Sequence, residues 1–315
     1  RRSTPMPDHA AADMPLVPTQ NRLIAAHLNE YADLLEAQGD DGFRIKAYRT
    51  AAREIEALSD SLRNVFETGG AKALIALRGI GRGIAAAIVE MLTTGHWQQL
   101  DRLKGSLTPE ALFGSIPGIG KKLANRLVDT LDIETLEDLE AALRLGETPV
   151  PGIGPRRRAA NLAVLGERLA RHRRETMLAH AGDEPPVSLL LDADALYRTQ
   201  AEAGDLRRIA PKRFNPTGEA WLPIMHARRG DWHLTVLYSN TARAHELDRT
   251  RDWVVIYFHD ADGPEGRRTV VTERTGSLAG MRVVRGREDE CRQHYATSPT
   301  GVAAAVKNTS PLETG

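Results

Sequence analysis

The sequence LRGIGRGIA at residues 77–85 recurs as IPGIGKKLA at 116–124 and as VPGIGPRRRAA at 150–160. In each copy an apolar residue and one further residue precede Gly-Ile-Gly, and a segment typical of a helix follows. Glycine allows a tight turn and the close approach of another backbone, and the central isoleucine is expected to fill a core. Internal repetition of this kind indicates a repeated structural unit. We therefore predict three short hairpins that each lead into a helix.

Each hairpin is expected to bind a phosphate group. The first N–H groups of a helix have no partner inside it and lie at the positive end of its dipole, which favours anions. Basic side chains follow each turn and add positive charge. The residues expected to contact phosphate are Gly79, Gly81, Arg82, Gly118, Gly120, Lys121, Lys122, Gly152, Gly154, Arg156, Arg157 and Arg158. Such a turn contacts no base edge, so the predicted binding is independent of nucleotide sequence.

Two common glycine-rich loops fit this pattern less well. A dinucleotide-binding loop needs a preceding strand and a third glycine, and the third glycine is missing from two copies. A Walker loop needs Gly-Lys followed by Ser or Thr, which no copy has. A plain connection between helices is the remaining alternative, and its repetition in three similar contexts makes it the weaker one.

The composition limits the classes of protein to consider. The 315 residues include 42 basic and 42 acidic side chains, so the formal net charge is zero. The charge is uneven along the chain, because residues 150–174 hold seven arginines and one glutamate. The single cysteine, Cys291, fits a reducing compartment. No apolar run has the length of a membrane span or the place of a signal peptide. We predict a cytoplasmic protein with no membrane partner.

The residue pattern divides the chain into five segments. Residues 1–18 are rich in proline and are expected to form a disordered lead-in. Apolar residues at helical spacing then predict helical domains at 19–105 and 106–180, the first with one hairpin and the second with two. An α+β module is expected at 187–296, and a disordered tail at 297–315. The predicted fold is multi-domain, with an all-α helix–hairpin–helix N-terminal half followed by a smaller α+β C-terminal domain.

Four runs in the last third favour strands, because they are rich in β-branched and aromatic residues. They are WHLTVLY at 232–238, DWVVIYF at 252–258, RRTVVTE at 267–273 and MRVVRG at 281–286. The last two are expected to pair as a hairpin. SNTARAHEL at 239–247 and GREDECRQHY at 286–295 are expected to be helical.

The three hairpins and the segment FRIKAYRTAAREIEAL at 43–58 resemble the N-terminal half of family X DNA polymerases, without a recognisable catalytic palm. The resemblance covers about residues 20–174. It implies a small helical domain that holds a 5′-phosphate at a gap, with Arg44 and Tyr48 in the phosphate pocket, and a second helical domain that holds the duplex. It also implies that main-chain carbonyls of the hairpins hold K⁺ or Na⁺. Here these carbonyls belong to Leu77, Ile80, Ile116 and Ile119.

Two departures from the family argue against its enzymatic activities. Where family members with deoxyribose-phosphate lyase activity carry a Schiff-base lysine, this chain has Ala87, and Gly83 stands where a phosphate-binding lysine is found. The amines of Lys46, Lys72 and Lys104 have no predicted place in a site. No Gly-Ser turn with metal-binding aspartates follows the helical half at a suitable position. The prediction therefore leans against an enzyme and assigns no catalytic residue.

The α+β module offers weaker candidates for a metal site. Asp192 and Asp194 would share one face of a strand and could then bind a metal, but the Leu and Ala residues around them favour a helix. A metal site built from His233, His245 and Glu246 is conceivable, although their spacing matches no known motif.

Basic and aromatic residues are interleaved in the same module, which suits stacking on a single nucleic-acid strand. A small β core with a solvated basic rim is the alternative. The residues concerned are Arg207, Arg208, Lys212, Arg213, Phe214, Trp221, Arg228, Arg229 and Trp232.

The main prediction is a DNA-binding protein that holds the sugar–phosphate backbone of gapped, nicked or branched DNA in DNA repair. The α+β module would be an accessory module or would bind a repair protein. The alternative is a DNA-processing enzyme, an abasic-site lyase, nuclease or degenerate nucleotidyltransferase, with catalysis in the C-terminal half. A protein-binding scaffold is a third hypothesis, and its complexes would survive bulky substitutions at Gly81, Gly120 and Gly154.

Overall fold

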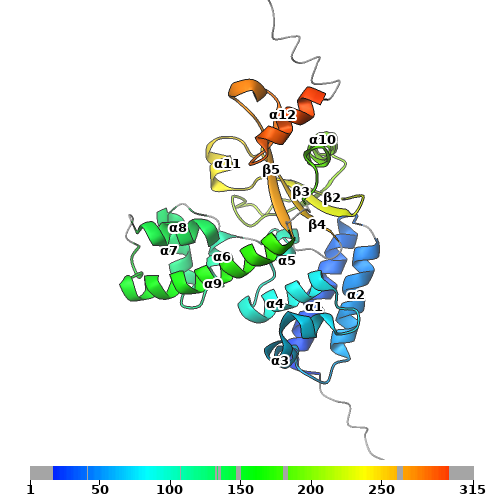
Figure 1. Ribbon diagram of the computed structural model, residues 1–315, viewed down its shortest axis with the longest axis vertical. Coiled ribbons are helices and arrows are strands. Elements are labelled where there is room, and N and C mark those ends of the chain that lie inside the picture. The colour runs from blue at the N-terminus through cyan, green and yellow to red at the C-terminus, as the bar shows by residue number, and fades with distance from the viewer. Residues whose placement is uncertain are drawn as a thin grey trace, which may run out of the picture.

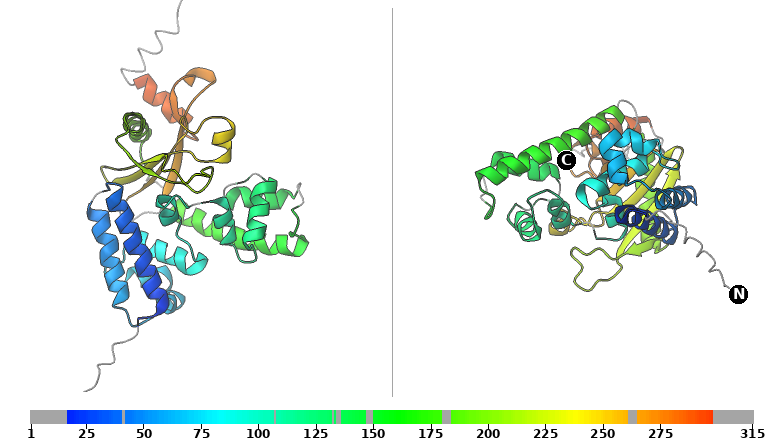
Figure 2. Two further views of the ribbon diagram at one scale, coloured as in Figure 1. Left: turned by 180° about the vertical axis from the view of Figure 1, so that it is seen from behind. Right: turned by 90° about the horizontal axis from the view of Figure 1, so that it is seen from below.

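The computed structural model describes residues 17–40, 42–106, 108–131, 133, 136–146, 150–179, 184–260 and 265–297. Three lobes of secondary structure are visible, and they meet around helix α5 (Figures 1 and 2). Two lobes are helical and the third holds a six-stranded sheet. This arrangement confirms the predicted multi-domain fold, a helical N-terminal half followed by an α+β region. The disordered segments expected at both ends fall almost entirely outside the described residues.

The first lobe contains five helices. They are α1 (Thr19–Ala37), α2 (Gly42–Glu56), α3 (Leu62–Ile75), α4 (Arg82–Thr94) and α5 (Gln98–Leu103). The first two lie side by side (Figure 1), because each carries apolar residues at helical spacing. Ile24, Leu28 and Leu35 of α1 and Ile55 of α2 belong to one apolar core, and each of these side chains is at most 2% exposed.

The second lobe contains four helices and has its own apolar core. The helices are α6 (Pro109–Gly114), α7 (Lys121–Leu131), α8 (Leu136–Leu145) and α9 (Pro155–Ala179). Phe113, Leu127, Leu139 and Leu165 are fully buried in this core. Two of the three glycine-containing hairpins connect these helices, as the sequence predicts.

The third lobe is an antiparallel sheet whose strands pair in the order of the chain. The strands are β1 (Arg207–Ile209), β2 (Leu222–Arg229), β3 (Trp232–Tyr238), β4 (Val254–His259), β5 (Gly266–Thr272) and β6 (Arg282–Val284). Helices α10 (Val187–Ala203), α11 (Ala242–Glu246) and α12 (Glu288–Thr297) and a short 3₁₀ turn, η1 (Gly276–Leu278), complete it. The four predicted strands are confirmed, and so is the β5–β6 hairpin.

Strands β1 and β2 have no clear signal in the sequence. Strand β2 begins with four consecutive buried residues, and one of them is Pro223, which cannot donate a ladder hydrogen bond. Its carbonyl is instead bonded by the hydroxyl of the fully buried Tyr197 on α10, which also accepts from the backbone N–H of Tyr238. A tertiary contact thus stabilises a strand that lacks alternating hydrophobicity.

Helix α10 packs across one face of the sheet and carries both Asp192 and Asp194. Asp194 is 1% exposed, and its carboxylate accepts two hydrogen bonds from Arg282 on β6, at 2.9 and 2.6 Å. Arg282 also bonds Asp252, so one guanidinium links a helix to two parts of the sheet. Asp192 is exposed on the same helix. The expectation of a helix here is confirmed, and Asp194 has a structural partner.

The first and third lobes share one apolar core, although the second lobe lies between them in the sequence. At their contact, the guanidinium of Arg102 on α5 donates to both carboxylate oxygens of Glu265, at 3.0 and 2.8 Å, and lies 3.4 Å from the ring centre of Tyr257. Nearby, the Lys212 N–H donates to the Gly105 carbonyl across 2.8 Å. Residues far apart in the chain therefore form one body.

His226 on β2 contacts the end of α1 within this body, and its burial makes the stability of the protein depend on pH. Its ring bonds Thr235 through Nδ1 and Gln38 through Nε2, and burial, assisted by Arg44 and Arg102, lowers its pKa from 6.5 to about 3. The unfolded chain therefore binds more protons below pH 6.5, and the free energy of unfolding must fall as the pH decreases. Between pH 6.5 and 4 we expect a loss of up to about 1.4 kcal/mol per pH unit from this group.

Urea unfolding of the parent protein and of His226→Gln across this pH range measures the effect. The variant should lose part of the slope while showing a fixed difference from the parent above pH 7, where both rings are neutral. His259, whose pKa burial lowers to about 4, supplies the same sign in both proteins. Equal slopes for parent and variant would contradict the prediction.

No helix among the described residues is both long enough and apolar enough to cross a membrane.

Candidate nucleic-acid interface

The three hairpins have the same backbone geometry. In each, the N–H of the isoleucine donates to the carbonyl of the residue three positions earlier, at 3.2 Å in the first hairpin and 3.0 Å in the other two. The first glycine of each turn has a positive φ, +75° at Gly79, +85° at Gly118 and +98° at Gly152, which side chains with a Cβ rarely adopt. Ile80 and Ile119 are buried, and Ile153 is half-buried. The repeat seen in the sequence is therefore one structural unit used three times.

The second glycine of each hairpin begins a helix at the surface. The carbonyls of Gly81, Gly120 and Gly154 accept the first helical hydrogen bonds of α4, α7 and α9, each at 2.9 Å. All three glycines are exposed, and an added Cβ would meet no atom within 4 Å. The first amides of these helices therefore lie where a phosphate can approach. Helix α9 offers one donor fewer, because Pro155 occupies its first position.

The first two hairpins also expose basic side chains. Arg82 begins α4, and Lys121 and Lys122 begin α7. All three are exposed and form no hydrogen bond or ion pair with any residue that the structure describes. They are thus available to an anion at the same place as the helix amides.

The arginines of the third hairpin are used differently from the expectation. Arg158 donates to the carbonyls of Leu143 and Arg144, so it caps the end of α8. Arg157 donates to the Gly152 carbonyl at 2.6 Å. Arg156 is exposed and has no partner within the described part of the chain. Of the three arginines, Arg156 alone has a guanidinium without a partner among the described residues, as the phosphate prediction requires.

Arg44 and Tyr48 do not face solvent. They are 6% and 8% exposed, and the Arg44 guanidinium bonds the Asp40 carboxylate at 2.7 Å and the Tyr31 hydroxyl at 2.9 Å. The Tyr48 ring stands edge-on to Tyr31, 4.7 Å away, and burial raises the pKa of Tyr48. The pair implied for a 5′-phosphate pocket is therefore packed inside the first lobe, where Tyr48 also borders a large cavity.

The residues at the lyase position and the amines of the first lobe have different surroundings. Ala87 on α4 is buried, and Gly83 is exposed. Lys104 is paired with Glu30 at 2.7 Å, and Lys72 is exposed on α3.

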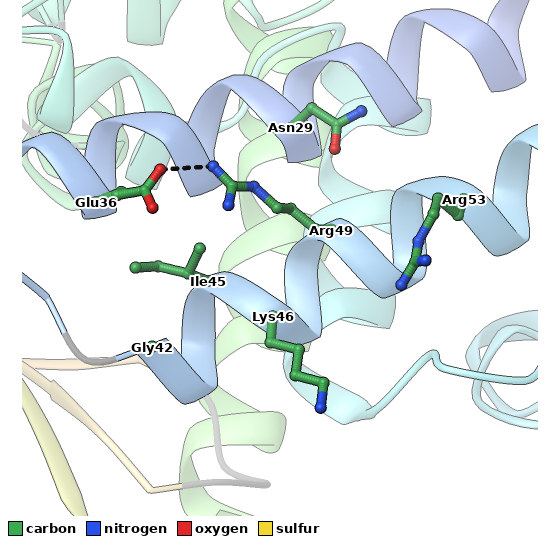
Figure 3. A pocket seen from close by; sticks show the side chains of 7 residues that line it. All are labelled: Asn29, Glu36, Gly42, Ile45, Lys46, Arg49 and Arg53. Atoms are coloured by element: carbon green, nitrogen blue, oxygen red, sulfur yellow. Dashed lines mark hydrogen bonds and ion pairs between the residues drawn. The ribbon is translucent and has the colours of Figure 1, made fainter.

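Lys46 lines a pocket of about 580 Å³ on the outer side of α1 and α2, together with Arg49 and Arg53 (Figure 3). Arg49 is paired there with Glu36 at 2.7 Å. This pocket is separated from Ala87, which lines a different cavity.

The hairpin carbonyls are compatible with a monovalent cation. The carbonyls of Leu77 and Ile116 each accept one turn hydrogen bond, and a carbonyl oxygen has a second lone pair. Oxygen atoms are the ligands that such hard cations prefer. Leu77, Ile80, Ile116 and Ile119 therefore remain the residues that would hold K⁺ or Na⁺.

The histidines proposed for a metal site do not converge. The His233 ring on β3 stacks on His259 at 5.2 Å between centres, whereas the His245 ring on α11 bonds the Asn240 side chain at 2.6 Å. Within the described part of the chain, no three His, Cys, Asp or Glu side chains are placed to hold a metal ion.

One large cavity, about 2030 Å³, lies where the three lobes meet. Arg82 and Gly83 line it from the first hairpin, Pro117 from the second, and alternate residues of β4 and β5 from the sheet. The sheet residues include Val255, Tyr257, His259, Arg267, Thr269 and Val271. The intervening residues Val254, Ile256 and Val270 are buried on the opposite face, toward α10. The hairpins and one face of the sheet therefore border the same cavity, which no pattern in the sequence indicates.

Substitution of Gly79 tests the geometry of the first hairpin. A Cβ at this position meets Glu54 Cγ at 3.3 Å and Thr50 Cγ2 at 3.4 Å, and the φ of +75° is itself unfavourable for alanine. We expect Gly79→Ala to lower the free energy of unfolding by about 1–2 kcal/mol. Gly83→Ala is the matched control, because its Cβ meets nothing within 4 Å in a helix that favours alanine. Thermal unfolding that ranks the two variants the other way would contradict the hairpin geometry.

Comparison with known proteins agrees with these lobes. A helix–hairpin–helix domain model matches residues 19–97, and a SAM-like helix–hairpin–helix tandem model matches residues 110–162. The chain is 29% identical over 143 residues to the DNA polymerase/3′-5′ exonuclease PolX of Bacillus subtilis (strain 168). That match covers 44% of this chain and 24% of the relative, so the chain spans about a quarter of the length of that protein. The helical half of the chain is thus a helix–hairpin–helix half like that of the family X DNA polymerases.

Proposed function

We propose that the chain is a DNA-binding protein that holds the sugar–phosphate backbone, independently of sequence, at gaps, nicks or branched junctions during DNA repair. The observation that carries this proposal is the pair of hairpins at Gly79–Gly81 and Gly118–Gly120. The first combines an exposed helix start with Arg82, and the second combines one with Lys121 and Lys122; these cations have no partner among the residues that the structure describes. Amide donors and cations at one place bind phosphate oxygens without contacting bases.

The similarity to PolX supports DNA as the partner, because that relative is a DNA polymerase and exonuclease by name. Its activities are not part of the proposal. The alanine at position 87 has no amine for Schiff-base chemistry. The sheet lobe is proposed as an accessory module that binds the same DNA or a repair protein. We also propose that the first helical domain ends at residue 105 and that the α+β module begins at residue 187.

Fluorescence anisotropy with labelled DNA tests the proposal. The full chain is titrated with gapped, nicked and intact duplexes of two unrelated sequences between 50 and 300 mM KCl. We expect equal affinity for the two sequences, tighter binding to gapped or nicked DNA, and a linear fall of log K with log salt. Binding that is absent, or that does not change with salt, would reject the proposal.

The same titration in NaCl, KCl and LiCl tests the hairpin cation. If Leu77, Ile80, Ile116 and Ile119 hold K⁺ or Na⁺ through their carbonyls, then LiCl at equal ionic strength should give weaker binding. Identical affinities in the three salts would remove the cation from the proposed function.

A further inference from the structure

One exposed aromatic residue has a backbone conformation that L-amino acids rarely adopt. Phe214 lies in the connection between β1 and β2, is 45% exposed and has a φ of +53°. A bulky residue with positive φ is an outlier whose conformation costs free energy unless its surroundings impose it. Such outliers are concentrated at ligand-binding sites.

The surroundings do impose this conformation. On one side, the Lys212 N–H donates to the Gly105 carbonyl of the first lobe at 2.8 Å. The Asn240 side-chain amide donates to the Arg213 carbonyl at 3.2 Å. On the other side, the Asn215 amide donates to the Glu219 carbonyl at 2.8 Å, which closes the following turn. The ring is therefore presented by a connection that is held on both sides.

Three further side chains surround this ring. The Arg213 guanidinium lies 4.6 Å from the Phe214 ring centre, and the tilted His245 ring lies 4.3 Å from it. Trp221 stands edge-on to His245 at 6.3 Å. We call Phe214, Arg213, His245 and Trp221 the aromatic shelf. An aromatic face beside a guanidinium is the combination on which nucleobases stack.

The position of the shelf connects it to the proposed DNA interface. Arg213, Asn240 and Arg243 line the same cavity as Arg82 and Pro117 of the first two hairpins. A DNA strand held by these hairpins and continuing through the cavity would pass Arg213, and its next unpaired base would reach Phe214. Internal base pairs of a duplex are stacked on both faces and offer none to the shelf, whereas an unpaired nucleotide does.

We propose that the aromatic shelf binds one unpaired nucleobase of a strand whose duplex part is held by the hairpins. This inference rests on the proposed function and adds to it the reason for a preference for gaps, ends or junctions. Stacking accepts every base, so the site is expected to be tolerant of sequence.

The experiment compares a blunt duplex with the same duplex carrying a four-nucleotide overhang, for the full chain and three variants. Phe214→Asn removes the ring but accepts a positive φ, so the connection keeps its shape. Phe214→Tyr keeps the ring. Leu247→Ala is the control, because Leu247 is a 41% exposed apolar residue of the same lobe that does not line the cavity.

We expect the overhang to strengthen binding of the parent, Phe214→Tyr and Leu247→Ala by about ten-fold. Phe214→Asn should lose most of this gain and keep its affinity for the blunt duplex. An overhang of abasic sugar–phosphate units should give only a small gain, equal in the four proteins, because it supplies phosphates but no ring to stack.

The experiment distinguishes failure of the proposed DNA-binding function from failure of base binding at the aromatic shelf. If no protein binds the blunt duplex, the proposed function is wrong. If the blunt duplex is bound but Phe214→Asn keeps the gain from the overhang, or the abasic overhang gives the same gain, the shelf does not bind a base and the inference is wrong. A gain that Leu247→Ala also loses would likewise overturn the assignment to Phe214.

Discussion

The triple variant Arg82→Glu, Lys121→Glu, Lys122→Glu is expected to bind duplex DNA roughly 100-fold more weakly than the parent at 100 mM salt. The three cations are exposed and have no partner within the described residues, so their replacement breaks no internal contact. Each one that neutralises a phosphate contributes about 0.9 to the slope of log K against log salt. The slope should therefore become shallower by about 3. Anisotropy across a salt series gives both quantities.

A control variant with the same change in net charge separates a local effect from a general one. Arg251→Glu, Arg274→Glu, Arg292→Glu changes three exposed arginines of the sheet lobe that lie outside the cavity lining. We expect it to keep most of the affinity and the full salt slope. An equal loss in both variants would mean that the overall charge of the molecule, and not the hairpins, governs binding.

Arg102→Ala is expected to produce the largest loss of stability, about 3–5 kcal/mol in the free energy of unfolding. The Arg102 and Glu265 side chains are 8% and 18% exposed and form a bidentate pair, and the guanidinium also covers the Tyr257 ring. Removal of the arginine leaves a carboxylate without its partner at the contact between two lobes. Urea unfolding measures the change. The double variant with Glu265→Gln should recover part of it, because the uncompensated charge is then gone.

A surface ion pair in the same lobe serves as the comparison. Arg49 is 41% exposed and bonds Asp33 and Glu36. Exposed pairs contribute little to stability, so Arg49→Ala should change the unfolding midpoint far less than Arg102→Ala. If both substitutions cost the same, the contact between the lobes is not the buried ion pair that the geometry indicates.

Local features of this protein could be predicted from the sequence. Each hairpin needs a glycine with positive φ and an isoleucine whose N–H bonds the carbonyl three residues earlier. All of these residues lie within five positions of the chain. Strand β3 occupies the predicted residues 232–238 because its β-branched and aromatic composition is visible in one window. Helix α10 is likewise indicated by the Leu and Ala residues around Asp192.

Features that depend on distant partners could not be predicted in the same way. Arg44 is bonded to Tyr31 and Tyr48 packs against Tyr31 and Trp97, which belong to other parts of the first lobe. Arg102 meets Glu265 across 163 positions of the chain. Arg158 is bonded to carbonyls at the end of α8, 14 and 15 residues earlier. The sequence does not distinguish an arginine that caps a helix from an arginine that is available to bind a phosphate. Only the tertiary fold distinguishes Arg156 from its two neighbours.

The core shared by the first and third lobes has a topological consequence for the lobe between them. The chain enters the tandem of hairpins after Ser106 and leaves it after Ala179, and both connections lead back into the same body. The tandem is therefore an insertion with two anchors, and it cannot rotate about a single bond like a terminal domain. Breakage of the chain at either anchor would leave the two fragments joined through the common core. The spacing between the first hairpin and the other two, and hence between the phosphates that they would hold, is constrained by this double attachment.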